Sequence, residues 1–135
     1  MYFDSSAFAK RYVEEKGSDV VEQLCREATE LALSVLCVPE IISALSRRVR
    51  EGSISPTQYR EAKSYLSAEV ADATIVNLIP DVVAEAIRVL ENNAIRATDA
   101  LHIACALQWN AEIFISADER QLSAAIGTNL RTQRV

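Results

Sequence analysis

The sequence is poor in the residues that bind zinc or form disulfides. It has one histidine and three cysteines in 135 residues, and Cys25, Cys37 and Cys105 show no C-x-x-C spacing. An odd number of cysteines in apolar segments predicts reduced thiols in the core of a cytoplasmic protein. His102 has no partner ligand at a metal-binding spacing, which excludes most zinc sites. Its place within an apolar helix favours core packing over catalysis.

The chain also lacks an excess of positive charge and any long apolar run. It has 14 Lys and Arg against 19 Asp and Glu, for a net charge of −5, which argues against a broad electrostatic grip on nucleic acid but not against a local one. No run reaches the roughly 20 apolar residues of a membrane helix. The first expected strand begins at Tyr2, so no room for a signal peptide is expected. We therefore expect a soluble cytoplasmic protein with no membrane partner.

Strand-like and helix-like segments alternate along the chain. Half of the residues are hydrophobic, so we expect one domain, 1–135, with its own core. The segments expected to form strands are 2–3, 31–38, 73–79, 113–115 and, more weakly, 129–133. The segments expected to form helices are 5–15, 19–28, 39–51, 56–70, 82–90, 100–109 and 119–125. This alternation predicts an α/β fold with a parallel sheet covered by helices on both faces.

The stretch 97–119 is the one around which the rest is organised. Nearly every residue from Ala100 to Trp109 is apolar, which is typical of a helix buried on most of its circumference. The short run 113–115 is typical of a central strand. Asp99 opens this helix and Asp118 follows this strand. Because a charge beside a core is costly unless something holds it there, we interpret both acids as ligands of a metal ion.

Two earlier acids stand at similar junctions. Asp4 follows the first strand at once, and Glu40 follows the second expected strand by two residues. Ligands of parallel sheets bind beyond the carboxyl ends of the strands, so all four acids are expected to meet at one edge. Carboxylates so close together repel and need a counter-charge. Oxygen ligands without His or Cys select Mg²⁺ or Mn²⁺, and such a site is suited to phosphodiester hydrolysis.

Each acid also has an ordinary structural explanation. Asp4 can cap the helix that follows it. Glu40 and Asp99 stand in first helical turns, where the helix dipole favours acids. The segment Ser116–Glu119 fits a capping box in which Asp118 is merely compatible with the dipole. Four acids at strand–helix junctions are nevertheless better explained together.

Four blocks of the sequence resemble the motifs of PIN-domain ribonucleases, in particular VapC-type toxins. They are Tyr-Phe-Asp4-Ser-Ser-Ala-Phe, Val-Pro-Glu40-Ile-Ile-Ser-Ala-Leu, Ala-Thr-Asp99-Ala-Leu-His-Ile-Ala and Ile-Ser-Ala-Asp118-Glu-Arg-Gln-Leu. The resemblance covers essentially the whole chain, in the family's order. It implies a PIN-like three-layer α/β/α fold with a five-stranded parallel sheet. It also implies endonucleolytic cleavage of RNA with Mg²⁺ or Mn²⁺, a cognate antitoxin and a homodimer.

The resemblance also assigns roles to individual residues. The family's acidic quartet, which is catalytic and holds the metal, is matched by Asp4, Glu40, Asp99 and Asp118. Ser6 matches a small hydroxyl residue after the first Asp, and Ser116 stands where Thr is frequent. We expect both hydroxyls to support the acids or to contact phosphate.

A few basic and aromatic side chains are candidates for binding RNA. Arg47 lies seven residues after Glu40 on nearly the same helix face, and Arg96 lies one turn before Asp99; both are expected to contact phosphates. Further candidates are Lys10, Arg11, Arg48 and Arg50 for phosphates, although solvated surface explains them better, and Tyr12, Tyr59 and Tyr65 for base stacking, although core or partner contact explains them better.

Two other functions fit part of the pattern. A non-catalytic RNA-binding or protein-interaction module could carry the same fold and acids, and metal-dependent RNA cleavage would separate it from a nuclease. A phospho-acceptor domain also gathers acids around Mg²⁺, but it needs a late lysine near the phosphate. The last lysine here is Lys63, which argues against a phospho-acceptor.

Overall fold

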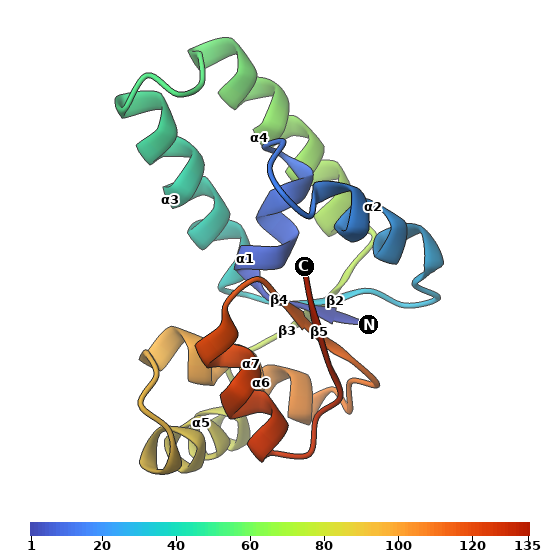
Figure 1. Ribbon diagram of the computed structural model, residues 1–135, viewed down its shortest axis with the longest axis vertical. Coiled ribbons are helices and arrows are strands. Elements are labelled where there is room, and N and C mark those ends of the chain that lie inside the picture. The colour runs from blue at the N-terminus through green and yellow to red at the C-terminus, as the bar shows by residue number, and fades with distance from the viewer.

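A five-stranded parallel sheet forms the middle of the computed structural model, which describes residues 1–135 (Figure 1). Its strands are β1 (Tyr2–Phe3), β2 (Ala32–Ser34), β3 (Thr74–Val76), β4 (Phe114–Ser116) and β5 (Thr132–Arg134). They lie in the order β3-β2-β1-β4-β5, and each neighbouring pair is parallel. The predicted α/β class and five-stranded parallel sheet are confirmed.

Helices cover both faces of this sheet, as the three-layer prediction requires. They are α1 (Ser5–Phe8), the 3₁₀ turn η1 (Ala9–Arg11), α2 (Ser18–Glu27), α3 (Cys37–Arg50), α4 (Pro56–Ala71), α5 (Pro80–Asn92), α6 (Ala97–Gln108) and α7 (Glu119–Gly127). In Figure 1 the helices α1–α4 lie above the sheet and α5–α7 lie below it. None of these helices combines the length and the apolar character needed to cross a membrane.

Two cores lie on opposite faces of the sheet, because successive strand residues point to opposite sides. Tyr2 and Phe114 belong to the core under α5, α6 and α7. Phe3 and Ile115, their neighbours in sequence, belong to the core under α1–α4. The helix α6 is buried along most of its length, as its composition predicts, with every residue from 102 to 106 buried.

The strand expected at 31–38 is wrong in its second half, because β2 ends at Ser34 and α3 begins at Cys37. The Ser34 hydroxyl accepts a hydrogen bond from the backbone N–H of Leu36 at 3.1 Å, a local turn that ends the strand. Pro39 then falls in the first turn of α3, where its missing N–H would have no partner within the helix anyway. Glu40 is therefore a first-turn residue of α3.

Smaller boundary errors have similar local causes. The helix expected over 5–15 ends at Arg11, because the Ser18 hydroxyl donates to the Lys10 carbonyl at 2.8 Å and the chain turns back. The strand expected at 73–79 stops at Val76, since Pro80 takes the first position of α5. The final strand lies at Thr132–Arg134, later than the expected 129–133.

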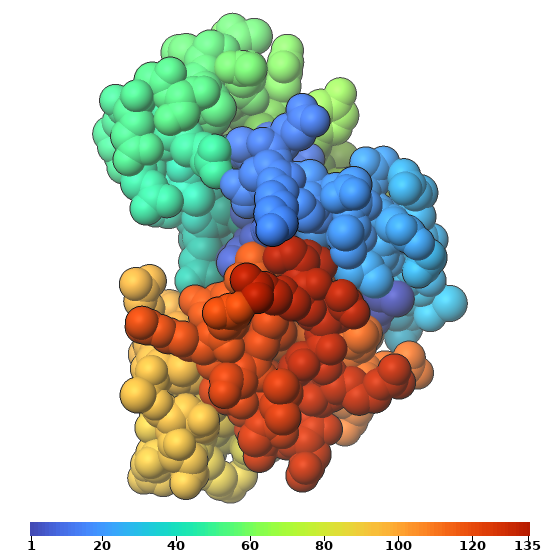
Figure 2. All heavy atoms as spheres, in the orientation of Figure 1, coloured from blue at the N-terminus to red at the C-terminus, as the bar shows by residue number.

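The strand order reverses between β1 and β4. From β1 the chain moves outward through β2 and β3, and then returns to build β4 and β5 on the other side. Ligands of open parallel sheets bind at such a reversal, beyond the carboxyl ends of the strands. Asp4 follows β1 here, and Asp118 follows β4. The space-filling view shows the surface hollowed on its left side, between the α3–α4 hairpin and α5 (Figure 2).

Candidate active site

Asp4 is buried at the end of β1 and caps α1. It is only 4% exposed, and its Oδ1 accepts a hydrogen bond from the backbone N–H of Ala7 at 2.8 Å. The Ser6 hydroxyl lies 2.9 Å from Oδ1 and 2.8 Å from Oδ2. Burial raises the pKa of Asp4, and the neighbouring His102 and these hydrogen bonds offset only part of that rise. Asp4 is therefore both a cap and a buried acid whose negative charge is poorly compensated.

Ser116 connects Asp4 to the segment after β4. Its fully buried hydroxyl lies 3.0 Å from Asp4 Oδ2 and 2.8 Å from Gln121 Oε1. It also accepts a hydrogen bond from the backbone N–H of Asp118 at 3.0 Å. The Ser6 hydroxyl lies 3.3 Å away and itself accepts from the N–H of Ala117. Both serines named by the resemblance thus lie against the first acid and order the loop that carries the last one.

Asp118 is exposed and is the N-cap of α7. Its Oδ1 accepts hydrogen bonds from the backbone N–H groups of Arg120 at 2.8 Å and Gln121 at 3.3 Å. The alternative explanation of Ser116–Glu119 as a capping box does not hold, because the Ser116 side chain is buried. Asp118 itself takes the capping role.

Asp99 lies close to Asp118 at the start of α6. Its Oδ2 accepts a hydrogen bond from the backbone N–H of Arg96 at 3.2 Å. Burial raises the pKa of Asp99, and the negative charge of Asp118 raises it further against the effect of Arg96. The Gln121 amide donates to the Asp99 backbone carbonyl at 3.2 Å. Through Gln121 and Ser116, the positions of Asp4, Asp99 and Asp118 are coupled.

Glu40 joins the site from α3 through a different set of contacts. Its Oε2 lies 2.8 Å from His102 Nε2 and accepts a hydrogen bond from the Ser5 hydroxyl at 2.5 Å. Burial raises the pKa of Glu40, but the hydrogen bonds from His102 and Ser5 outweigh that effect, so the pKa is lowered overall. Glu40 is therefore ionised at neutral pH and fixed by two partners on α6 and α1.

The four acids do not form a ready-made cage. No three Asp, Glu, His or Cys side chains lie close enough together to hold one ion. In three of the acids, however, one carboxylate oxygen takes every hydrogen bond from the protein and the other takes none. The unengaged oxygens are Glu40 Oε1, Asp99 Oδ1 and Asp118 Oδ2.

This donor set fits a hard divalent cation. Mg²⁺ usually keeps several waters and takes one or two carboxylates together with substrate phosphates, rather than a complete protein cage. The available donors are carboxylate oxygens, which suit Mg²⁺ and Mn²⁺ and not zinc. Burial is the main cause of the raised pKa values of Asp4 and Asp99, and a cation beside these two carboxylates would favour their ionised forms.

Sequence reasoning missed three residues of this network. Gln121 is only 1% exposed. In the sequence it is a polar residue beside the apolar positions of α7, and that pattern could have indicated a buried polar side chain. His102 was assigned to core packing; it is buried, but it also holds Glu40, and its spacing of three residues from Asp99 would have placed both on one helix face. Ser5 is the first residue of α1, and its hydroxyl contacts Glu40.

The two main candidates for binding phosphate, Arg47 and Arg96, have exposed side chains. Arg47 has 66% of its side chain exposed, and its distance of 4.0 Å to Glu51 makes only a weak surface pair. Arg96 is exposed and immediately precedes α6, where its backbone is capped by Asp99. Both guanidinium groups are thus free of strong protein partners.

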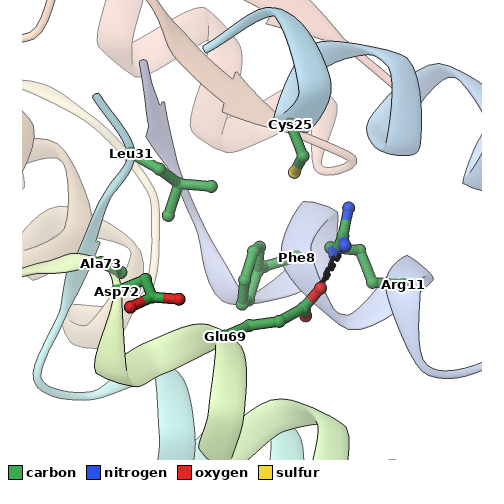
Figure 3. A pocket seen from close by; sticks show the side chains of 7 residues that line it. All are labelled: Phe8, Arg11, Cys25, Leu31, Glu69, Asp72 and Ala73. Atoms are coloured by element: carbon green, nitrogen blue, oxygen red, sulfur yellow. Dashed lines mark hydrogen bonds and ion pairs between the residues drawn. The ribbon is translucent and has the colours of Figure 1, made fainter. Parts of the chain in front are cut away.

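Arg11 and Tyr12 have partners within the protein. Figure 3 shows Arg11 turned toward Glu69 of α4 in a pocket of about 190 Å³ that Phe8 and Cys25 also line. Arg11 forms an ion pair with Glu69, and the Tyr12 hydroxyl donates to the same carboxylate. These contacts tie η1 to α4, so we assign both side chains to the fold and not to RNA. Of the tyrosines, Tyr65 is the most accessible, at 69% exposed.

The chain is similar to known proteins along most of its length. The family model described as PIN domain matches residues 1–127. Ribonuclease VapC45 and Ribonuclease VapC49, both from Mycobacterium tuberculosis, are each 30% identical to it over 107 residues, which cover 79% of this chain and 74% of the relative. The family model and the two relatives show that the chain belongs to the PIN-domain family.

Solved structures show the same fold at lower identity. VapC20 from Mycobacterium tuberculosis, described as a sarcin–ricin loop cleaving toxin, superposes with a TM-score of 0.70 at 14% identity, over 91% of this chain and 93% of that one. VapBC2 from Rickettsia felis, bound to a DNA fragment from its promoter, gives a TM-score of 0.70 at 12% identity, over 100% of this chain and 99% of that one.

Proposed function

This chain belongs to the PIN-domain family, and we propose that it is a VapC-type endoribonuclease that hydrolyses RNA phosphodiester bonds as the toxin of a toxin–antitoxin pair. The observation that carries the proposal is the coupling of Asp4, Asp99 and Asp118 through Ser116 and Gln121, at the point where the strand order reverses. Carboxylates at that edge are the groups that metal-dependent phosphodiester hydrolysis requires.

The proposed cofactor is Mg²⁺ or Mn²⁺. Asp4, Glu40, Asp99 and Asp118 would hold it, directly or through water, together with phosphate oxygens of the substrate. When bound, the ion supplies charge stabilisation for the phosphate and a water of lowered pKa. The raised pKa values of Asp4 and Asp99 support this assignment, because a cation would relieve the cost of their ionised forms.

The side chains themselves perform orientation and proton handling. Asp4 is held in one position by Ser6, Ser116 and the Ala7 N–H. Glu40 is ionised, and its Oε1 has no protein partner, so it can accept a hydrogen bond from the attacking water and orient it. This preorganisation before the substrate arrives is what a hydrolytic site needs.

RNA binding is proposed to rest on a few local contacts, because the chain is acidic overall. Arg47 and Arg96 are proposed to contact phosphates, since both are exposed and neither has a strong ion-pair partner. Their contribution would be sequence-independent positioning.

The proposed partners are a cognate antitoxin and a second copy of this chain, in the cytoplasm. The similarity to VapBC complexes supports an antitoxin. An acidic site that reaches solvent suits inhibition by an arginine of that partner, since arginine pairs bidentately with carboxylates. Copurifying the neighbouring gene product should suppress RNA cleavage, and replacing its arginines should restore it. Light scattering of the isolated chain tests the homodimer.

One observation favours a second candidate, a non-catalytic RNA-binding or protein-interaction module. No three acids, histidines or cysteines converge on one point, and Asp4 and Asp118 both cap helices. A chain in which those acids serve only as caps would bind RNA or a partner without cleaving anything.

A cleavage assay distinguishes the two functions. Purified protein is incubated with total RNA in Mn²⁺, in Mg²⁺ and in chelator, beside the Asp99→Asn variant. The nuclease proposal expects new RNA ends only with metal and only with the unaltered chain. Cleavage that persists in chelator would contradict the metal role. Binding of RNA without cleavage under any metal would favour the module.

A further inference from the structure

A buried line of hydrogen bonds leads from the core to Glu40. The Tyr2 hydroxyl on β1 lies 3.2 Å from His102 Nδ1, and His102 Nε2 lies 2.8 Å from Glu40 Oε2. Tyr2 is fully buried, and the His102 side chain is 3% exposed while that of Glu40 is 34% exposed. The line therefore begins among apolar side chains and ends at the solvent-facing site.

The partners determine which ring nitrogen of His102 carries the proton. An ionised carboxylate only accepts hydrogen bonds, so Nε2 must carry a hydrogen to donate to Glu40. In the neutral imidazole Nδ1 is then an acceptor, and the Tyr2 hydroxyl is the donor that it needs. The assignment follows from the hydrogen-bond pattern, and each group in the line has a donor or acceptor role that its neighbour matches.

We propose that Tyr2 and His102 are positioning residues that hold Glu40 in the one orientation in which its Oε1 stays available at the site. Ser5 supplies the second anchor, since its hydroxyl donates to the same Oε2 at 2.5 Å. The proposal rests on the proposed function for what Glu40 does, but the hydrogen-bond line itself does not depend on it.

The physical need for such a line comes from the length of the glutamate side chain. A half-exposed glutamate on a helix samples many rotamers, and ordering it costs conformational free energy. Two hydrogen bonds to Oε2 offset that cost before any substrate or ion is present. His102 is fixed in turn by Tyr2, because a buried imidazole with an unpaired Nδ1 would lose a hydrogen bond it could make in water. Partners of this kind set the orientation of metal-site ligands.

The line can be tested without any activity assay, because His102 is the only histidine in the chain. A long-range ¹H–¹⁵N correlation spectrum shows both imidazole nitrogens of one residue with no assignment problem. We expect Nε2 to be protonated and Nδ1 to be an unprotonated acceptor. The Tyr2→Phe variant should shift the Nδ1 signal, whereas Tyr12→Phe, which removes a hydroxyl bound to Glu69, should not. A proton on Nδ1, or no change in Tyr2→Phe, would overturn the proposal.

Coupling to Glu40 is tested by a double-mutant cycle on Mn²⁺ affinity and on kcat. His102→Leu should weaken both by about 10- to 100-fold, and His102→Gln, which keeps a donor near the Nε2 position, should recover much of the loss. In a Glu40→Gln background, His102→Leu should have little further effect, because its target has been removed. An equal loss in both backgrounds would show a merely structural role.

The two failures are distinguishable. If the unaltered chain neither binds Mn²⁺ nor cleaves RNA, the proposed function fails, and the imidazole spectrum still tests the line. If His102→Leu does not fold, the Tyr2→Phe variant replaces it in the cycle, since it removes a single oxygen from a side chain that otherwise packs unchanged.

Discussion

Ser116 and Asp4 are 112 residues apart in the chain, yet the Ser116 hydroxyl lies 3.0 Å from the Asp4 carboxylate. The contact exists because β1 and β4 are hydrogen-bonded neighbours, so the residues that end them meet at one edge of the sheet. Ser116 also accepts from the N–H of Asp118. One buried hydroxyl therefore sets the distance between the first and last acids of the site.

Removing that hydroxyl should affect both stability and activity. Ser116→Ala leaves the Asp118 N–H without its acceptor and Asp4 without one of its donors, so we expect a loss of about 1–3 kcal/mol in the free energy of unfolding. Denaturant unfolding measures the loss, and cleavage should fall in parallel. The exposed Ser123 on α7 is the control, because its replacement by Ala should change stability by about 0.5 kcal/mol or less. Equal effects at the two serines would contradict the proposed role of Ser116.

Neutralising the site acids should abolish cleavage while keeping the fold. Asp4→Asn and Asp99→Asn preserve shape and remove charge, and we expect each to lower kcat on the order of a hundredfold or more, as when a group that stabilises the transition state is lost. Asp81→Asn is a matched control, since Asp81 is an exposed first-turn acid of α5, on the face of the sheet that also carries α6. Full activity in Asp99→Asn would remove Asp99 from the site.

The sequence predicts the fold well because the strongest periodic signals belong to buried elements. The apolar run of α6 and the short runs of β1 and β4 carry enough information to be found without tertiary context. Two boundaries, the ends of β2 and η1, failed where the competing signal was a single polar contact. Ser34 ended β2 by binding the Leu36 N–H, and no pattern of apolar residues records such a turn.

The sequence points to the acids of the candidate site but not to the network around them. Asp4, Asp99 and Asp118 are candidates in the sequence because each stands beside an apolar segment. The structure adds Gln121 and the line from Tyr2 through His102 to Glu40, which depend on which side chains face each other across α1, α3 and α6. Helix packing determines these side-chain contacts, and the pattern of residues in a single sequence does not predict them.

The pKa of Asp4 predicts a pH dependence of stability in chelator. Because burial raises this pKa in the folded state, the folded protein binds the proton more tightly than the unfolded chain, whose Asp pKa is about 3.9. The ionisation of Asp4 therefore lowers the free energy of unfolding as the pH rises from the pKa of the unfolded state through the pKa of the folded state. Above the folded-state pKa the loss is constant. The unfolding free energy of Asp4→Asn minus that of the unaltered chain should rise across this window. A difference independent of pH would contradict the raised pKa, and saturating Mn²⁺ should flatten the rise.

Asp118 has two roles that substitution can separate, since it caps α7 and carries a charge near Asp99. Asn caps helices about as well as Asp, so Asp118→Asn should be at least as stable as the unaltered chain in chelator. Asp118→Ala loses the cap and should be less stable by about 1 kcal/mol. Thermal melts of the three proteins in chelator measure both effects.

The stabilisation by Mn²⁺ then distinguishes the charge of Asp118 from its role as a helix cap. Binding at a hundred times the dissociation constant stabilises a folded protein by about 2.7 kcal/mol, and both Asp118 variants should gain less than the unaltered chain because they bind the ion more weakly. Ser55→Ala is the matched control, since Ser55 caps α4 by binding the Gln58 N–H. It should lose a similar amount in chelator and still show the full gain with Mn²⁺. If all four proteins gain equally, Asp118 is only a helix cap and the ion binds without it.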